Sequence, residues 1–398
     1  MAGSLAEREL TMPHRAIRLP LWYGRNATPG VTDMTTAVQQ AIALCCSGGT
    51  VDGCGELYAV SNVFLKSNMT LRNIRFITLP SAVDDVSPLN IGDDLRAGTA
   101  AYTASQTAPG ITDVILDNVT IDGNRQNQTG ITLRDGGRHG IKVAGYCRRI
   151  TMRNVRAENC ATDGLLIYRG LHAPTNLDSV QHSFDVLLDN CQFNGNRRHG
   201  MAAESFDGLT IRNSTFNGNG LDVRGGSVEG DLGALSLDLR YGNGIDFEGY
   251  GLGSRMTNLR LEGVTARGNS RDGILLMDTV DPAHDDFLPR GPVWLDRCDL
   301  DMGADHQNGE YCLTVTSTIA NRANGSVFDR VMIRDCNLDG IVMFRSVARA
   351  QISGGVQTVP SAVVRGALDY ATLQQVGIVS NQAGWSSSNS TLTTVAAA

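Results

Sequence analysis

The chain is poor in charged and in aromatic residues. Its 398 residues contain 19% charged and 6% aromatic side chains, against 41% hydrophobic side chains. That hydrophobic share excludes a disordered chain. No run of about 18 apolar residues occurs, so the sequence offers no membrane-spanning helix. The first residues lack a basic start followed by an apolar stretch, and we therefore expect no signal peptide.

An excess of basic residues is also missing. Lys and Arg number 34, Asp and Glu number 41, and the formal net charge is −7. Binding to duplex nucleic acid requires a basic face, so we expect no nucleic-acid partner. The acidic balance leaves a neutral or cationic glycan open as a partner.

Cysteines in metal-ligand spacing are missing as well. The nine cysteines are an odd number and include no C-x-x-C pair. We therefore expect neither a zinc site nor a dense disulfide framework. Reduced, buried thiols of a protein made in a cytosol fit this usage. No metal and no cofactor is expected.

Glycine is abundant, with 45 residues, and several of these glycines belong to a repeat between residues 111 and 345. Each unit alternates apolar residues around an Asn, and then a polar residue followed by Gly opens another alternating run. The first pattern recurs at residues 114–124, 150–159, 186–196, 209–219 and 259–269. The polar–Gly pairs are His139-Gly140, Asp163-Gly164, His199-Gly200, Asn243-Gly244, Asp272-Gly273 and Asp339-Gly340.

Alternation with a period of two indicates strands, and each unit holds three of them between short corners. Asn and Gly suit corners because both tolerate a positive φ. The shortest unit, from Gly140 to Gly164, has 24 residues. Such coils bury their apolar sides only by stacking. The sequence therefore predicts an all-β fold, a single-stranded right-handed parallel β-helix with three short strands per coil.

A helix is expected before the repeat. Residues 35–44 read as an amphipathic helix with Thr at its start, and this helix would cap the open end of the coil. We divide the chain into four parts. These are an N-terminal extension (1–34), the capping helix with the first coils (35–110), the β-helix core (111–356) and a C-terminal segment (357–398), a candidate trimer contact.

The stretch TDMTTAVQQAI at 32–42, followed by segments 48–51 and 64–71, resembles the pectate-lyase-like superfamily, in its polygalacturonase-like and phage-tailspike branch. The resemblance spans about residues 20–350. It implies a right-handed β-helix that acts on a polysaccharide, and a tailspike would be a homotrimer on a virion tail or outside the cell. The Asn-Thr-Asp, Asp-Asp, Gly-His-Gly set of polygalacturonases is missing, so their catalytic residues are not carried over.

Candidate catalytic residues come from the strand after each Gly. The first and third residues of this strand are apolar and should face inward, so the second and fourth face outward. On two adjacent coils these outward positions carry Glu204, Asp246 and Glu248. Carboxylates on strands about 4.8 Å apart raise at least one pKa, which suits a general acid. We favour Asp246 with Glu204 or Glu248, and inversion, although both retaining and inverting separations are available.

The same face and its loops supply candidate substrate-binding residues. Tyr168, one coil earlier, would stack a sugar ring, and Lys142 shares its face. Long inserts at 169–183, 220–242 and 279–291 would wall a groove over the face. They carry His172, Asp178, His182, Arg240, Tyr241, His284, Asp285 and Asp286. His199 and Asp272 belong to the row before Gly, where polar side chains usually satisfy backbone groups. The substrate-binding candidates are Tyr168, His199, Lys142, Arg240, Tyr241 and Asp272.

Further along, the outward positions become apolar at Leu275, Met277, Val342 and Phe344. Such a patch should be covered, either by residues 357–398 or by another subunit. We therefore expect a homotrimer with this patch near its axis.

These residues indicate a polysaccharide depolymerase that hydrolyses a bacterial surface glycan with paired carboxylates. Two alternatives stay open. A polysaccharide lyase acting on a uronate-containing glycan needs a basic group, and Lys142 and Tyr168 lie on the right face but lack a basic cluster. A non-catalytic glycan-binding or fibre module predicts that Glu204, Asp246 and Glu248 are salt-bridged and dispensable.

Overall fold

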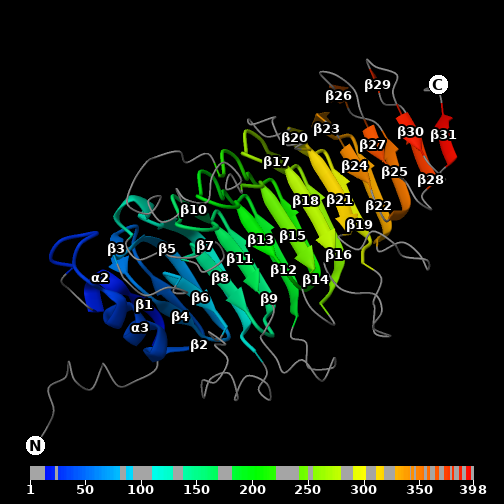
Figure 1. Cartoon of the computed structure of the whole chain (residues 1–398). Helices are drawn as coiled ribbons and strands as arrows, with labels where there is room; N and C mark the ends of the chain where they lie inside the picture. The colour runs from blue at the N-terminus through cyan, green and yellow to red at the C-terminus, as the bar shows by residue number, and fades with distance from the viewer. Residues whose placement is uncertain are drawn as a thin grey trace, which may run out of the picture.

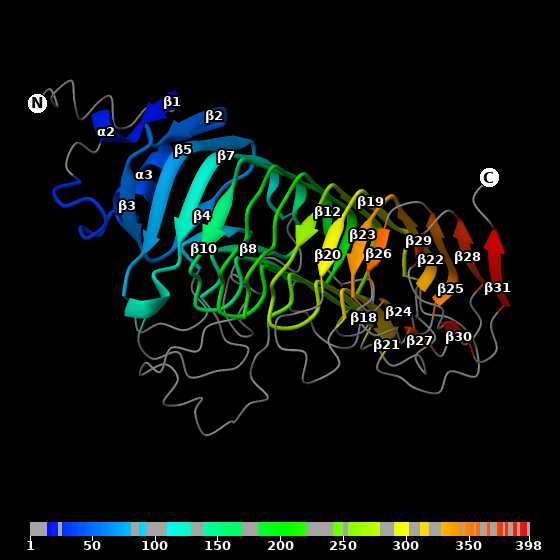
Figure 2. The same cartoon turned by 90° about the horizontal axis from the view of Figure 1, so that it is seen from above.

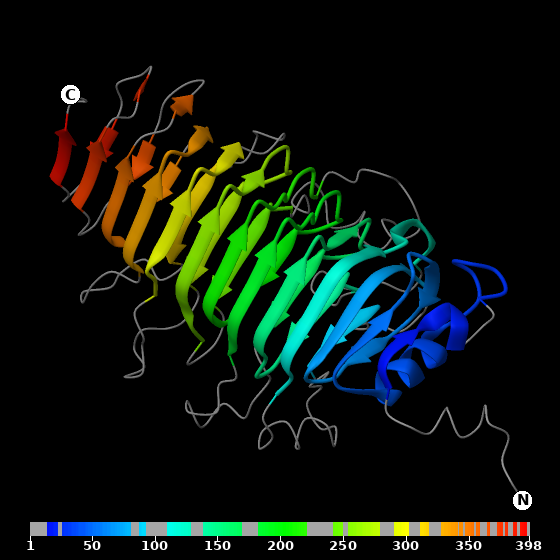
Figure 3. The same ribbon diagram turned by 180° about the vertical axis from the view of Figure 1, so that it is seen from behind.

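Parallel strands stack along one axis in the computed structural model (Figure 1). The structure describes residues 14–22, 26–80, 87–92, 110–128, 138–168, 182–220, 242–249, 254–278, 290–301, 311–317, 328–340 and a series of strands from 342 to 395. The helical end and the C-terminal strand lie at opposite ends of the stack (Figure 3).

The first wall of the coil is a 15-stranded sheet. Its strands are β1 (His14–Arg18), β2 (Cys45–Asp52), β3 (Leu57–Val60), β5 (Met69–Thr78), β7 (Thr112–Asp122), β9 (Arg148–Arg153), β10 (Arg156–Glu158), β12 (Ser183–Asp189), β14 (Phe206–Arg212), β16 (Met256–Glu262), β19 (Val293–Asp296), β22 (Phe328–Arg334), β25 (Val347–Ser353), β28 (Thr372–Val376) and β31 (Thr391–Val395). The last two strands carry this sheet into the C-terminal segment.

The second wall, a nine-stranded sheet, holds the candidate site. Its strands are β4 (Val63–Leu65), β6 (Leu89–Ile91), β8 (Ile141–Ala144), β11 (Leu165–Tyr168), β13 (Met201–Ala203), β15 (Ile245–Gly249), β18 (Ile274–Asp278), β21 (Leu313–Ser317) and β24 (Val342–Phe344).

A shorter third wall closes the coil, and Figure 2 shows the three walls from above. It contains β17 (Thr265–Ala266), β20 (Asp299–Asp301), β23 (Asn337–Asp339), β26 (Val356–Thr358) and β29 (Val379–Ser380), while β27 (Val364–Gly366) pairs with β30 (Trp385–Ser387). The sequence β16, β17, β18 is one coil with one strand in each wall. The predicted parallel β-helix with three strands per coil is confirmed.

A helix caps the N-terminal end, as predicted. Helix α3 (Thr35–Leu44) buries Val38, Ala41 and Ile42 and packs on β2 and β4. The carboxylate of Asp33, not Thr35, accepts a hydrogen bond from the first turn, with 2.9 Å between Asp33 Oδ1 and the Thr35 nitrogen. Two shorter helical turns complete the described helices, α2 (Leu19–Trp22) and η1 (Arg125–Asn127).

Stacked apolar side chains fill the interior. In the second sheet Ile141, Leu165, Met201 and Ile245 are aligned on successive strands, and all are fully buried. The inward positions predicted for β8 to β18 are therefore confirmed. All nine cysteines are free thiols, and Cys191, Cys298 and Cys336 are buried in this interior.

The predicted apolar patch is wrong at its far end. Val342 pairs with Leu313, and Phe344 pairs with Val315, so Val342 takes an inward position and is 0% exposed. The sequence pattern missed strand β21, because Cys312 stands where other coils have Gly, and it misplaced β24 by one residue. The outward residues of β21 are threonines, and the apolar outward pair is reduced to Leu275 and Met277, both half-buried.

Asparagines turn one set of corners, as predicted. Asn118, Asn154, Asn190 and Asn213 all have φ between 50 and 55°. The Asn190 side chain also donates a hydrogen bond to that of Asn154, at 2.7 Å. This exposed row is a structural ladder.

Gly164, which precedes a strand of the second sheet, is required for a different reason from the positive φ that the sequence predicts. Gly164 does not have a positive φ, but a Cβ atom there would lie 2.7 Å from the carbonyl oxygen of Gly200. Glycine is required because two backbones approach closely, not because the corner needs a left-handed residue.

A second asparagine ladder is fully buried. The Oδ1 atom of Asn219 accepts the backbone N–H of Asn196 at 3.0 Å, and Asn269 Oδ1 accepts that of Asn219 at 3.0 Å. The Asn219 amide also donates to Asn269 Oδ1 at 3.0 Å. These amides satisfy backbone donors at a corner where the strand ladder is interrupted.

We predict that Asn219→Ala lowers the free energy of unfolding by about 3 kcal/mol, because it leaves the buried Asn196 N–H without an acceptor. Thermal and urea unfolding followed by circular dichroism measures the change. The control is Asn258→Gly, which tolerates the positive φ of 56° and removes only an exposed hydrogen bond to Asp207. It should change stability by less than about 0.5 kcal/mol. Equal losses in both variants would contradict the buried ladder.

Candidate functional site

The second sheet presents the predicted carboxylates on its outer face. Asp246 on β15 pairs with Ala202 on β13 and with Leu275 on β18. The pairing of β13 with β15 ends at Ala203 with Phe247, and Glu204 and Glu248 are the next residues of the two segments. The strand register therefore places Asp246 and Glu248 on one strand, and the juxtaposition of Glu204 with them stays a prediction.

Asp246 occupies an unusual environment for a carboxylate. The residue is 7% exposed, and its Oδ2 atom lies 3.1 Å from Nε2 of His199. Its Oδ1 atom is buried without a hydrogen-bond partner among the described residues. Burial, reinforced by the charge of Glu248, raises the pKa of Asp246 well above its ordinary value. The side chain is therefore suited to hold a proton where other carboxylates are ionised.

His199 is held as a neutral ring. Its Nδ1 atom lies 3.1 Å from the backbone nitrogen of Asn243 and accepts that N–H. Burial lowers the pKa of His199 to about 3. An accepting Nδ1 leaves the proton on Nε2, so the ring donates a hydrogen bond to Asp246 Oδ2.

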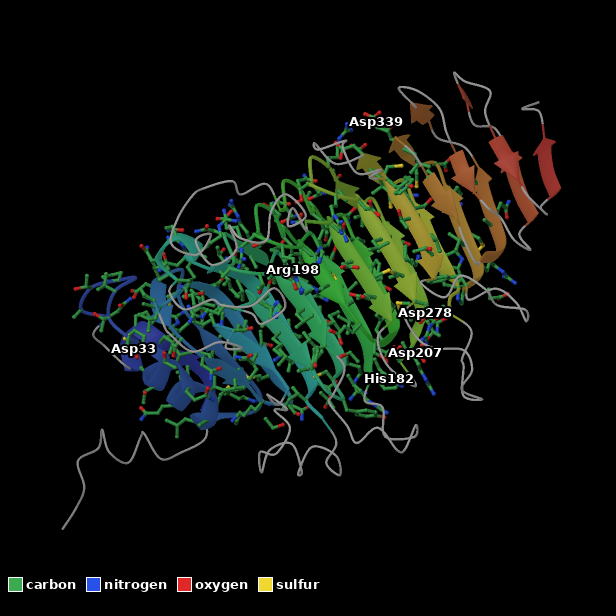
Figure 4. The ribbon with its side chains drawn as sticks, viewed as in Figure 1. Asp33, His182, Arg198, Asp207, Asp278 and Asp339 are labelled. Atoms are coloured by element: carbon green, nitrogen blue, oxygen red, sulfur yellow. The ribbon has the colours of Figure 1, made fainter. Side chains whose placement is uncertain are left out.

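A buried ion pair supports the His199 backbone. Arg198 contacts Asp163 through two hydrogen bonds, 2.7 Å to Oδ1 and 2.5 Å to Oδ2. His139 Nδ1 lies 3.1 Å from Asp163 Oδ2, and Asp163 Oδ1 accepts the backbone N–H of His199 at 3.0 Å. Burial alone would raise the pKa of Asp163, but Arg198 and His139 hold it well below its ordinary value. Figure 4 labels Arg198 midway along the coil.

The row before the strands continues to Asp272. Asn243 Oδ1 accepts the Asp272 N–H at 3.2 Å, and Asp272 Oδ1 accepts the Tyr311 N–H at 3.0 Å. Burial raises the pKa of Asp272 to about 6. Asp272, a candidate for substrate binding from its sequence, thus satisfies a backbone donor of the next coil.

Lys142 and Tyr168 meet on the same outer face. The Lys142 Nζ atom lies 5.4 Å from the centroid of the Tyr168 ring, and both side chains are half-buried. This contact covers part of one ring face with a cation. The pair lies on the two strands before β13, next to the carboxylates.

Arg240 and Tyr241 lie outside the described residues, as do His172, Asp178, His284, Asp285 and Asp286. His182 is described and sits at the lower edge of the coil in Figure 4. Its Nδ1 atom is 2.6 Å from Ser205 Oγ. Within the described segments, no cluster of three or more His, Cys, Asp or Glu side chains is arranged to hold a metal ion. No described helix is long and apolar enough to cross a membrane.

The sequence did not reveal the hydrogen bond between His199 and Asp246. Two sequence patterns together carry the signal for this contact, namely the polar row before Gly and the outward carboxylate two residues after Gly. Since the strands stack in register, a row residue of one coil reaches the outward residue of the next.

We predict that stability falls as pH rises through the pKa of Asp272. A folded pKa of about 6, above the ordinary 3.8, means that the folded state keeps a proton that the unfolded chain has lost. The contribution is complete below the ordinary pKa and disappears above the folded pKa. Between about pH 5 and pH 7 the wild type should lose roughly 1 kcal/mol that the Asp272→Asn variant keeps.

Thermal unfolding across this pH range measures the difference. The control is Asp113→Asn, since Arg149 lowers the pKa of Asp113 to about 2 and its titration falls below the range. Identical pH slopes in wild type and Asp272→Asn would contradict the prediction.

Comparisons with known proteins agree with this architecture. Residues 102–284 match the family model described as "Right handed beta helix region". The A-module of the mannuronan C-5 epimerase AlgE6 of Azotobacter vinelandii superposes with a TM-score of 0.56 at 13% identity, over 92% of this chain and 96% of that chain. The Streptococcus pneumoniae surface adhesin PfbA gives a TM-score of 0.56 at 14% identity, over 91% of this chain and 86% of its own.

The tailspike gp49 of the Acinetobacter baumannii bacteriophage Fri1, a capsular polysaccharide depolymerase, gives a TM-score of 0.48 at 13% identity, over 95% of this chain and 64% of that chain. No curated protein matches the chain in sequence. The stacked parallel strands and the matched family model together show that this protein is a right-handed parallel β-helix.

Proposed function

We propose that this protein depolymerises a bacterial surface polysaccharide by glycoside hydrolysis. The observation that carries the proposal is Asp246, a buried carboxylate with a raised pKa and an oxygen without a partner, beside Glu248 on a rigid sheet. Burial of an acid with one unpartnered oxygen costs stability, and carboxyl groups in such environments are concentrated at functional sites.

Asp246 acts as the general acid. Its Oδ1 proton moves to the glycosidic oxygen as the bond between that oxygen and the anomeric carbon breaks. Glu248, two residues along the same strand and therefore about 6.8 Å away, takes a proton from the water that attacks the anomeric carbon. We favour inversion, because side chains with this backbone separation can hold their carboxyl groups within the roughly 6.5–9.5 Å that inverting enzymes use. Glu204 adds a second carboxylate beside Glu248.

The neighbouring outer face is the proposed binding surface. A glycan that lies along the stack would cross Lys142 and Tyr168 before it reaches the carboxylates, with the exposed part of the tyrosine ring available to a sugar. The mannuronan C-5 epimerase module shares the fold, and its named substrate, a polysaccharide, is consistent with this use of the face. We further propose that the protein is a homotrimer on a virion tail or outside the cell, with residues 357–398 near the contact.

A polysaccharide lyase is the second candidate function. The close approach of Lys142 and Tyr168 supplies two groups of the kind that removes a proton next to a uronate carboxylate. A lyase would release an unsaturated product that absorbs ultraviolet light, whereas hydrolysis produces reducing ends alone.

We predict that Asp246→Asn and Glu248→Gln each lower the rate of reducing-end release by about 10²–10⁴-fold, which is the usual contribution of a general acid or base. The assay incubates each variant with a panel of bacterial polysaccharides and measures reducing ends and ultraviolet absorbance. In the active wild type, the rate should fall as pH rises through the raised pKa of Asp246, because the acid loses its proton.

Glu262→Gln is the matched control, because Glu262 is a carboxylate at an outward position of the first sheet, away from the candidate site. It should retain full activity. Full activity in both site variants would show that the site is wrong, and absorbance without these carboxylates would favour the lyase.

A further inference from the structure

We infer that His199 is a positioning residue that confines the proton of Asp246 to Oδ1, the carboxyl oxygen that has no hydrogen-bond partner among the described residues. This inference deepens the proposed function and rests on it for the role of Asp246. The hydrogen-bond geometry around His199 carries the inference, and it can be tested without a substrate.

The first step is the choice of tautomer. The Asn243 N–H points at Nδ1 of His199, with 3.1 Å between the nitrogens. A proton on Nδ1 would oppose that N–H and leave a buried donor without an acceptor. The neutral ring therefore carries its proton on Nε2 and donates it toward Asp246 Oδ2, at 3.1 Å.

The second step concerns the carboxyl group. Since Oδ2 accepts a hydrogen bond from His199, a proton on Oδ2 would meet the Nε2–H. The acidic proton of Asp246 therefore belongs on Oδ1, the atom that has no partner among the described residues. A general acid with one oxygen engaged presents its proton in one direction, as catalysis requires.

The third step is the support of the ring itself. The His199 backbone N–H is held by Asp163 Oδ1 at 3.0 Å, and Arg198 fixes Asp163 by two hydrogen bonds. Backbone and ring of His199 are thus both tied to neighbouring coils. The ring is 97% buried at its side chain, which limits its rotation.

Several charged groups act on Asp246 from the elements around it. Glu248, Asp163 and Asp272 raise its pKa, and Arg198 lowers it. Glu248 lies on β15, Asp163 and Asp272 lie in the polar row before the strands, and Arg198 precedes the row residue His199. Glu204 follows β13 on the adjacent coil. His199 contacts Asp246 directly, with 3.1 Å between Nε2 and Oδ2.

Two substitutions separate positioning from structural support. In His199→Asn the amide Oδ1 takes the place of Nδ1 and still accepts the Asn243 N–H, but the donor to Asp246 is lost. In His199→Gln the amide Nε2 takes the place of the ring Nε2 and still donates to Asp246, but the acceptor for Asn243 is lost. A merely structural histidine would be replaced better by Asn, and a positioning histidine better by Gln.

We expect His199→Asn to fold with little loss of stability and to lower kcat by about 10²-fold, the scale of a misplaced catalytic group. The high-pH limb of its kcat profile should move to higher pH, because a hydrogen bond that favours the carboxylate has been removed. His199→Gln should restore part of kcat and the wild-type limb despite a lower melting temperature. Equal activity of the Asn variant and the wild type would overturn the inference.

Two spectroscopic measurements on the full chain test the same geometry without catalysis. In ¹⁵N-labelled protein, the ring nitrogens of His199, assigned from the His199→Asn variant, should show a protonated Nε2 and a bare Nδ1 at neutral pH. An Nδ1–H tautomer or an imidazolium would overturn the inference. The infrared band of the protonated Asp246 carboxyl, identified by its loss in Asp246→Asn, should shift in His199→Asn and recover in His199→Gln.

These readouts distinguish the two ways of failing. A protein with the expected tautomer and carboxyl band, but without activity on any polysaccharide, would contradict the proposed function and leave the His199–Asp246 geometry intact. An active protein with the other tautomer would contradict the positioning role alone.

Discussion

Stacking of parallel strands at about 4.8 Å is the constraint on which the rest of this molecule depends. It turns a 24-residue sequence repeat into columns of identical positions, inward for the core and outward for the surface. Side chains in one column stay next to those of the coils before and after them, because the backbone spacing is fixed. Like charges in one column therefore meet, and buried polar groups must find partners in the adjacent coil.

The environment of the candidate site follows from the same fixed strand spacing. Asp246 stays in a column between Ala202 and Leu275, where apolar neighbours deprive its charge of solvation. His199 comes from the row that elsewhere satisfies backbone donors, and here it contacts a carboxylate as well. Most polar residues of the row before Gly thus satisfy backbone groups, whereas His199 also positions the proton of Asp246.

Much of this arrangement could be predicted from sequence, because period-two alternation and corner asparagines are local signals. Alignment of the Gly positions alone predicts the inward column, and it also predicts the outward position of Asp246 between Ala202 and Leu275. Strand β21 is missed because Cys312 stands where other coils have Gly, and Val342 is misplaced because it lies two residues after Gly340, whereas Ile274 directly follows Gly273. The His199–Asp246 contact joins two coils, and which ring nitrogen faces which neighbour depends on the Asn243 backbone, which no spacing encodes.

The buried asparagine ladder has a consequence for how such chains change in length. Asn196, Asn219 and Asn269 each bond to the coil beside them and to no common frame. Register information is therefore passed from coil to coil. A whole coil could be duplicated or removed without disturbing the asparagine hydrogen bonds between distant coils. The gain or loss of a few residues within a coil would instead break its hydrogen bonds to both neighbouring coils. The molecule is therefore extensible in steps of one coil.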